Sequence, residues 1–171
     1  MTAVFVHGNL DTYHVWDAVR RLLPDTESVA LGLPGFGCPI PAGFTATKGE
    51  YVDWLIAALE RQSGPVDLVG HDWGCILTMR IASLRPDLVR SWAAGSGPVS
   101  GTYVWHPLAQ IWQTPGDGET WMINFDPAAY AASQIGNNIP PDVVHATANR
   151  VDVLMKDCHP AALPLRHQCG G

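Results

Sequence analysis

Short apolar segments alternate with segments of helical periodicity along the first part of the chain. Four apolar segments have the length and the turn-rich borders of buried strands: residues 3–6, 27–33, 66–69 and 91–94. Between them, apolar residues recur at helical spacing, which predicts helices over residues 12–23 and 47–59 and a third helix after residue 74. Strands that alternate with helices predict an α/β fold, with a parallel sheet covered by helices on both faces.

Local signals place some of the element borders. Thr47 and Glu50 have the spacing of a capping box, which predicts that a helix begins there. Gly70 predicts a turn after the third strand, and the helix that follows carries Ile76, Met79 and Leu84 before residues 85–87 end it.

The pattern changes after Pro98. Residues 99–158 contain no convincing strand but hold several aromatic residues and helical stretches, the last of which begins at residues 140–142. Residues 159–171 contain two prolines and end in paired glycines, so they predict no regular element. We therefore expect a sheet core over residues 1–98, a small helical layer over 99–158 and an irregular tail over 159–171.

Composition and charge narrow the function. The chain has 171 residues, 47% of them hydrophobic and 15% charged, which fits a globular protein. Its formal net charge of -6 and the lack of a basic stripe argue against a nucleic-acid partner. No apolar run is long enough to span a bilayer and no leader sequence is visible, so we expect a cytoplasmic protein without a membrane partner. The four cysteines lie far apart, which makes a disulfide framework or a zinc site improbable.

Candidate chemistry concentrates at Gly70-His71-Asp72-Trp73-Gly74, between a predicted strand and a predicted helix. Small residues at Gly70 and Gly74 allow a sharp turn, and the acidic residue at the centre then projects from the carboxyl end of the strand. The first turn of the helix offers free N–H groups and a positive dipole end, which suit a carboxylate. An aspartate at a helix start can also serve only as an N-cap.

Two further segments support the chemical interpretation. His7-Gly8-Asn9 follows the first strand, and Leu33-Pro34-Gly35-Phe36-Gly37 follows the second. We expect the backbone N–H of Asn9 to form an oxyanion hole with that of Trp73, and His7 to orient the turn.

Together these segments resemble the α/β-hydrolase superfamily, and most closely its haloalkane dehalogenase and epoxide hydrolase branch, in which aspartate replaces serine as the nucleophile. The resemblance implies a partial α/β-hydrolase fold whose helical layer is a cap. It implies that Asp72 forms an alkyl-enzyme ester with a small apolar haloalkane or epoxide, and that water then hydrolyses this ester. It implies no metal or organic cofactor.

The leaving group stays open at this point. In dehalogenases the side chains at the positions of Asn9 and Trp73 donate N–H bonds to the departing halide, but this chain has Leu10 where that family usually carries proline. Epoxide hydrolases instead use an acidic hydroxyl from the cap, for which Tyr103 and Tyr130 are the candidates. The oligomeric state is also open.

The family resemblance implies a catalytic histidine and an orienting acid after the later strands, and we expect neither within this chain. One hypothesis for residues 159–171 is an out-of-frame reading, because GC-rich codons of a plausible helix continuation spell residues 159–166 in a shifted frame. The alternatives to an active hydrolase are therefore a catalytically incomplete remnant, a small-molecule binding protein and a general esterase-like hydrolase.

Overall fold

Four parallel strands form the centre of the structure, a computed structural model that describes residues 1–9, 11–36 and 38–136. They are β1 (Thr2–Val6), β2 (Glu27–Leu31), β3 (Val66–His71) and β4 (Val89–Gly95). The sheet order is β2-β1-β3-β4, so β1 and β3 are the central strands and their carboxyl ends are neighbours. The predicted parallel sheet is confirmed.

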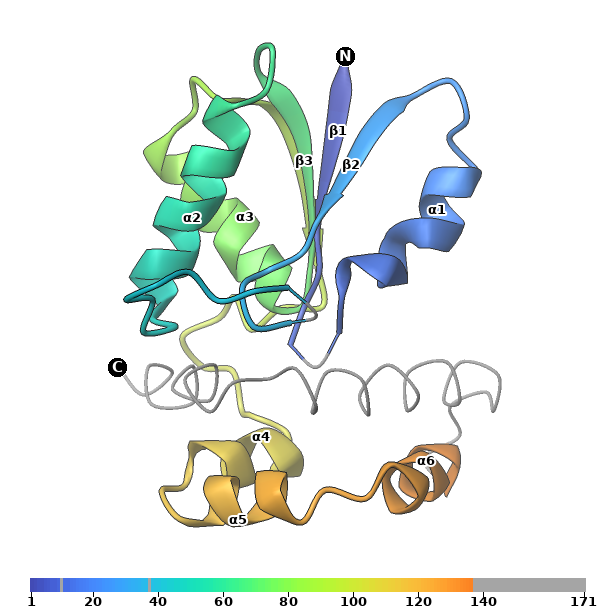
Figure 1. Cartoon of the computed structure of the whole chain (residues 1–171), viewed down its shortest axis with the longest axis vertical. Coiled ribbons are helices and arrows are strands. Elements are labelled where there is room, and N and C mark those ends of the chain that lie inside the picture. The colour runs from blue at the N-terminus through green and yellow to red at the C-terminus, as the bar shows by residue number, and fades with distance from the viewer. Residues whose placement is uncertain (10, 37, 137–171) are drawn as a thin grey trace.

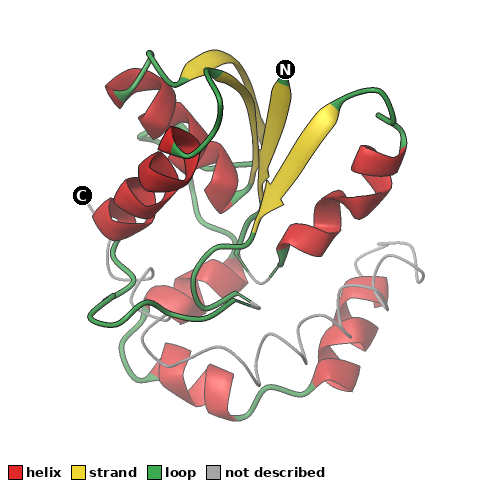
Figure 2. Ribbon diagram, turned by 45° about the horizontal axis from the view of Figure 1, so that its top comes forward, coloured by secondary structure: helices red, strands yellow, loops and turns green. Residues whose placement is uncertain are grey.

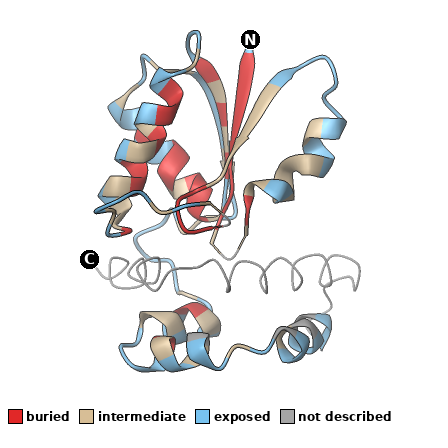
Figure 3. Cartoon of the chain, viewed as in Figure 1, coloured by how far each residue is buried: buried red, intermediate tan, exposed pale blue. Residues whose placement is uncertain are grey.

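Helices cover both faces of this sheet (Figure 1). On one face lie α2 (Lys48–Glu60) and α3 (Trp73–Leu84), and on the other lie the short 3-10 helix η1 (Tyr13–Trp16) and α1 (Asp17–Arg21). The hydrophobic core fills the space between the central strands, α2 and α3 (Figure 3). Its completely buried members include Val4, Val6, Leu55, Leu68 and Ile81.

Local structure differs from the sequence expectations in three places. The segment 12–23 is not one helix, because η1 and α1 divide it. The turn predicted at Gly70 lies later, since β3 continues through His71. The buried side of α3 includes Leu77 and Ile81, whereas Met79 is 37% and Leu84 is 45% exposed. The capping box at Thr47 and Glu50 is confirmed, with both of its reciprocal hydrogen bonds present.

A layer of short helices lies beyond the carboxyl ends of the strands (Figures 1 and 2). It consists of α4 (Pro107–Gln113), α5 (Asp117–Ile123) and α6 (Pro127–Gly136). Aromatic rings connect these helices, with centroid distances of 5.4 Å for Trp112 and Trp121 and 5.1 Å for Trp121 and Phe125. No helix in the described part of the chain is long and apolar enough to cross a membrane. The helix predicted from residue 140 and the tail at 159–171 lie outside the described residues.

Candidate active site at the carboxyl ends of the central strands

Asp72 occupies the turn between β3 and α3 in an unusual backbone conformation. Its φ of 53° and ψ of −117° lie in a region that residues with a side chain rarely adopt, so the turn stores backbone strain. Two hydrogen bonds hold the turn. The Asp72 N–H donates to the Gly95 carbonyl oxygen over 3.0 Å, and the Cys75 N–H donates to the Asp72 carbonyl oxygen over 3.0 Å. The strained conformation is therefore fixed from both β4 and α3.

Three glycines permit the close packing around Asp72. A Cβ atom on Gly70 would lie 2.1 Å from the Gly74 carbonyl oxygen, and one on Gly74 would lie 2.3 Å from the Val6 carbonyl oxygen. A Cβ atom on Gly8 would lie 2.4 Å from the Asp72 Oδ2 atom. At Gly70 and Gly74 the close approach of backbone atoms requires glycine, whereas at Gly8 a side chain would collide with the Asp72 carboxylate.

The loop after β1 meets the Asp72 side chain directly. The backbone N–H of Asn9 donates a hydrogen bond of 2.8 Å to Asp72 Oδ2, although the two residues are 63 positions apart in the sequence. They meet because β1 and β3 are paired in the sheet and both loops leave at the same edge. An amide hydrogen that donates to one carboxylate oxygen stabilises negative charge at that oxygen.

His7 is completely buried behind this contact. Its Nδ1 atom lies 2.8 Å from the Gly8 carbonyl oxygen, which can only accept, so Nδ1 carries the proton. Its Nε2 atom then accepts a hydrogen bond of 3.0 Å from the Leu33 N–H. Burial lowers the pKa of His7 from 6.5 to about 4, and the hydrogen bond to Gly8 opposes this shift. His7 is therefore a neutral imidazole at physiological pH.

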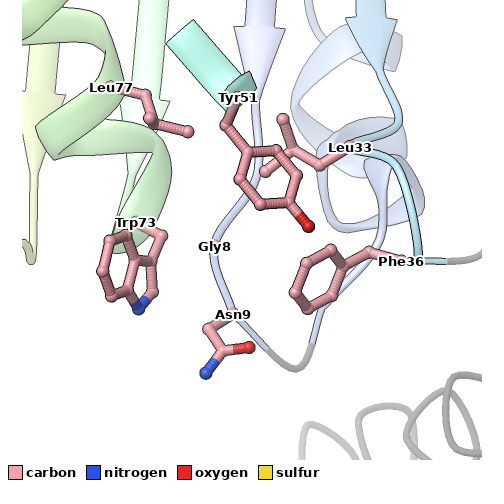
Figure 4. Close-up of a pocket in the computed structure, with 7 residues that line it drawn as sticks. All are labelled: Gly8, Asn9, Leu33, Phe36, Tyr51, Trp73 and Leu77. Carbon is pink, nitrogen blue, oxygen red and sulfur yellow. The ribbon is translucent and has the colours of Figure 1, made fainter. Parts of the chain in front are cut away.

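A narrow apolar pocket of about 10 Å³ opens beside the Asn9 loop (Figure 4). Its lining residues come from four segments of the chain: Gly8, Asn9, Leu33, Phe36, Tyr51, Trp73 and Leu77. The side chains of Asn9 and Trp73 project to the same side of the pocket, away from the strands (Figure 4). The Tyr51 hydroxyl donates a hydrogen bond of 2.8 Å to the Pro34 carbonyl oxygen, which ties the pocket wall to α2.

The structure thus brings together most of the residues that the sequence singled out and separates others. Five of these residues are neighbours at the carboxyl ends of β1 and β3: His7, Gly8, Asn9, Asp72 and Trp73. Gly70 and Gly74 belong to the same turn as Asp72. The wall residues Leu33 and Phe36 belong to a motif noted in the sequence, but Tyr51 and Leu77 carried only the periodic signal of core helices. Their lining role could not be read from that signal.

The two tyrosines predicted as candidate cap acids lie in different surroundings, and neither is among the pocket-lining residues. Tyr103 is exposed in the segment before α4, where its ring packs edge to face on Trp105 at 5.2 Å. Tyr130 is half-buried on α6, and its pKa is raised by burial and, to a smaller extent, by the charge of Asp11. Tyr130 therefore keeps its hydroxyl proton at neutral pH.

The described residues hold no group of three histidine, cysteine or acidic side chains that could bind a metal ion. His71, next to Asp72, is exposed and its ring meets Trp16 edge to face at 6.4 Å. His71 therefore extends toward the opposite face of the sheet from α3.

The model of the alpha/beta hydrolase family matches residues 3–167. The chain belongs to this family. Among curated proteins, it is 33% identical over 102 residues to an (E)-2-((N-methylformamido)methylene)succinate hydrolase of Acinetobacter baylyi. It is also 33% identical over 92 residues to a haloalkane dehalogenase of Bradyrhizobium diazoefficiens. The suspected resemblance to this branch of the family is thereby confirmed.

Solved structures support the same fold. The epoxide hydrolase VrEH1 of Vigna radiata superposes with a TM-score of 0.73 at 18% identity, over 98% of this chain and 64% of the other. The segment that matches the hydrolase of Acinetobacter baylyi spans 58% of this chain but only 39% of that protein. The segment that matches the dehalogenase of Bradyrhizobium diazoefficiens spans 53% of this chain but only 30% of that protein. The fold of the alpha/beta hydrolases is therefore established for this chain, whereas the relatives' activities are properties of longer proteins.

Proposed function

We propose that Asp72 is the nucleophile of a hydrolase reaction on a small apolar haloalkane or epoxide. The observation that supports the proposal best is the 2.8 Å hydrogen bond from the Asn9 N–H to Asp72 Oδ2. A purely capping aspartate directs its side chain to N–H groups of its own helix, and Asp72 makes no such capping hydrogen bond to α3. Its carboxylate instead accepts the backbone N–H of Asn9 on the loop after β1, at the edge of the sheet where ligands bind in open parallel sheets.

In this proposal the two carboxylate oxygens have different roles. Oδ2 accepts the Asn9 N–H, so Oδ1 is the atom that would attack the substrate carbon. The new bond joins Oδ1 to that carbon, and the carbon–halogen or carbon–oxygen bond breaks, with its electron pair going to the leaving atom. Water then adds to the Asp72 carboxyl carbon, and the resulting oxyanion on Oδ2 would be stabilised by the N–H groups of Asn9 and Trp73. Collapse of this adduct breaks the bond between the carboxyl carbon and Oδ1, and the product leaves as an alcohol that carries Oδ1 and one proton of the water. The second water proton goes to the solvent, and the carboxylate is regenerated with the oxygen of the water.

Halide and epoxide chemistries differ in what receives the leaving atom. For a halide, the side-chain N–H groups of Asn9 and Trp73, which project from the same side of the pocket, would solvate the departing anion. For an epoxide, the ring oxygen needs a proton, and Tyr103 and Tyr130 stay the two candidate donors. Burial raises the pKa of the Tyr130 hydroxyl, so this group carries its proton at neutral pH. The likeness of this chain to a haloalkane dehalogenase and to an epoxide hydrolase supports both substrate classes.

The alternatives predict other behaviour of the same site. A binding protein or an incomplete remnant would keep the pocket without bond formation at Asp72. A general esterase would act on acyl esters, for which ordinary members of the fold use serine at this turn.

A cytoplasmic location, which we include in the proposal, is supported by the two cysteines in the described residues, Cys38 and Cys75, which are free thiols.

The decisive experiment follows the first half of the reaction. The chain is incubated with a small bromoalkane or, separately, a small epoxide, and its intact mass and peptide masses are measured. We expect one adduct on the peptide that contains Asp72, or release of bromide or diol if the ester is hydrolysed. Asp72→Asn should abolish both, while the matched exposed change Asp53→Asn on α2 should leave both intact.

Each outcome separates the alternatives. If neither an adduct nor a product forms, the chain is a binding protein or an incomplete remnant. Labelling of other carboxylates at the same rate as Asp72 would show unselective alkylation. Hydrolysis of a p-nitrophenyl ester that survives Asp72→Asn would indicate an esterase with another nucleophile. Any of these results contradicts the proposal.

A further inference from the structure

The hydrogen bond to Asp72 depends on the orientation of one peptide group. The Asn9 N–H and the Gly8 carbonyl oxygen belong to the same planar peptide unit and point in opposite directions from it. At one end of this plane the N–H donates to Asp72 Oδ2 over 2.8 Å. At the other end the carbonyl oxygen lies 2.8 Å from His7 Nδ1. Fixing the carbonyl therefore fixes the direction of the N–H.

Glycine makes this control necessary. Gly8 has to lack a side chain because a Cβ atom would lie 2.4 Å from Asp72 Oδ2. A glycine beside the peptide plane leaves the plane free to rotate, since the backbone of glycine has more accessible conformations than that of other residues. An external partner for the Gly8 carbonyl removes this freedom.

His7 itself is held at several points. Its Nε2 atom accepts the Leu33 N–H over 3.0 Å, and its ring packs against Phe36 at 5.8 Å. Leu33 and Phe36 also line the apolar pocket, and the Tyr51 hydroxyl fixes the intervening Pro34 carbonyl. The pocket wall and the Gly8–Asn9 peptide are therefore attached to one imidazole.

We propose that His7 is a positioning residue, which donates its Nδ1 proton to the Gly8 carbonyl and thereby aims the Asn9 N–H at Asp72 Oδ2. The imidazole works as a neutral ring with a fixed tautomer. Its Nε2 acceptor links the alignment of the carboxylate to the wall of the pocket. The inference deepens the proposed function and rests on it where reactivity is concerned.

The low pKa of His7, about 4, agrees with this role. Protonation of Nε2 would replace an acceptor by a donor that faces the Leu33 N–H.

Two substitutions of His7 can separate the effects of its two hydrogen bonds, because each keeps only one of them. In His7→Asn the amide nitrogen lies at the same bond distance from the backbone as Nδ1 and can donate to Gly8. In His7→Gln the amide oxygen lies at the distance of Nε2 and can accept from Leu33. The first variant keeps the proposed positioning bond, and the second keeps only the attachment to the wall.

We expect His7→Gln to slow alkylation of Asp72 by roughly 10- to 100-fold, because a small misalignment of a catalytic contact has effects of this size. His7→Asn should stay within about threefold of the unchanged chain. The half-saturating substrate concentration should change in neither variant. Equal rates in the two variants, or a change in saturation alone, would overturn the proposal.

A second measurement does not depend on reactivity or on the variants. Long-range ¹⁵N–¹H correlation spectra of the unchanged chain report which imidazole nitrogen carries the proton. We expect the Nδ1–H form of His7 throughout pH 8 to 5, as the pKa of about 4 requires. An Nε2–H form, or titration near pH 6.5, would overturn the proposal even if the variants fail to fold.

Failure of the proposed function can be told apart from failure of this inference. If the unchanged chain forms no adduct, the proposed nucleophile fails, but the Asn9 amide proton still reports its hydrogen bond to the carboxylate. Its resonance should move in the same direction in His7→Gln as in Asp72→Asn and should stay in place in His7→Asn. A resonance unmoved by His7→Gln would refute the positioning role by itself.

Discussion

The sheet region, residues 1–98, and the helical layer, residues 99–136, are built on different principles. Around Asp72 the backbones of β1, β3 and α3 touch, and glycines are the only residues that fit between them. In the helical layer, contacts run mainly through aromatic rings, and large apolar side chains such as Val104 and Ile123 are more than four-fifths exposed. Figure 3 shows the same contrast, with buried residues gathered on the sheet and its helices.

This difference separates two kinds of constraint. The carboxylate is positioned by main-chain atoms, so its geometry depends on residues that cannot change size. The layer above it is connected by contacts between side chains. A fold divided in this way can keep its chemistry constant while the surface that faces a substrate varies.

The largest expected effect tests the sheet region directly. Gly74→Ala places a Cβ atom 2.3 Å from the Val6 carbonyl oxygen, so β1 and α3 must separate. We expect the free energy of unfolding to fall by more than about 3 kcal/mol. The matched change Gly136→Ala on α6, where a Cβ atom meets nothing within 4 Å, should have no effect or stabilise by up to about 1 kcal/mol. Urea unfolding followed by circular dichroism measures both, and equal stabilities would contradict the contrast between the regions.

A second prediction uses the buried imidazole of the sheet region. The pKa of His7 is about 4 in the folded chain, below its usual 6.5, so the unfolded chain binds the proton more tightly. The stabilising contribution of the neutral ring is complete above pH 6.5 and is lost as the pH falls through 4. The shift corresponds to about 3 kcal/mol.

The measurement is the free energy of unfolding between pH 7 and pH 4, for the unchanged chain and for His7→Phe. The variant should lack the part of the decline that His7 causes. The carboxylate of Glu50, whose folded pKa is about 2, titrates at lower pH in both chains. Parallel pH curves for the two chains would show that His7 is not buried as a neutral ring.

The smallest expected effect concerns the strain at Asp72. Both Asp72→Gly and Asp72→Ala lose the hydrogen bond from Asn9, but only glycine adopts a φ of 53° without strain. The free energy of unfolding of the glycine variant should therefore be about 1–2 kcal/mol higher than that of the alanine variant. In the helical layer the order reverses, since Ala132→Gly within α6 should destabilise by about 1 kcal/mol. Thermal unfolding of the unchanged chain and of the three variants measures these differences, and a difference of the opposite sign at either site would contradict the prediction.

Sequence reasoning succeeded where the deciding interactions are local. The reciprocal bonds of Thr47 and Glu50 span one helical turn, so their spacing alone predicts the helix start. The small residues around Asp72 likewise predicted a sharp strand-to-helix bend, although the strand continues to His71. The parallel sheet followed from the alternation of element types.

The missed features depend on contacts between distant parts of the chain. The partner of the His7 ring is Leu33, 26 residues away, and no periodicity indicates which backbone N–H will meet it. Tyr51 was identified as a core residue, and its position beside the pocket follows only from the packing of α2 against the loop at Pro34. Interpreting residues 12–23 as one helix failed because Trp16 packs on Phe5 where the chain changes from η1 to α1.

The pairing of β1 with β3 has a consequence for how reactivity arises during folding. Val6 lies opposite Gly70, and this alignment alone decides that Asn9 arrives at Asp72. A slip of one position would displace the loop by about 3.3 Å and exchange the faces of every side chain in β1. Under the proposed function, chemical labelling of Asp72 would therefore report strand alignment, because a refolding chain would become reactive only after β1 and β3 have paired in this register.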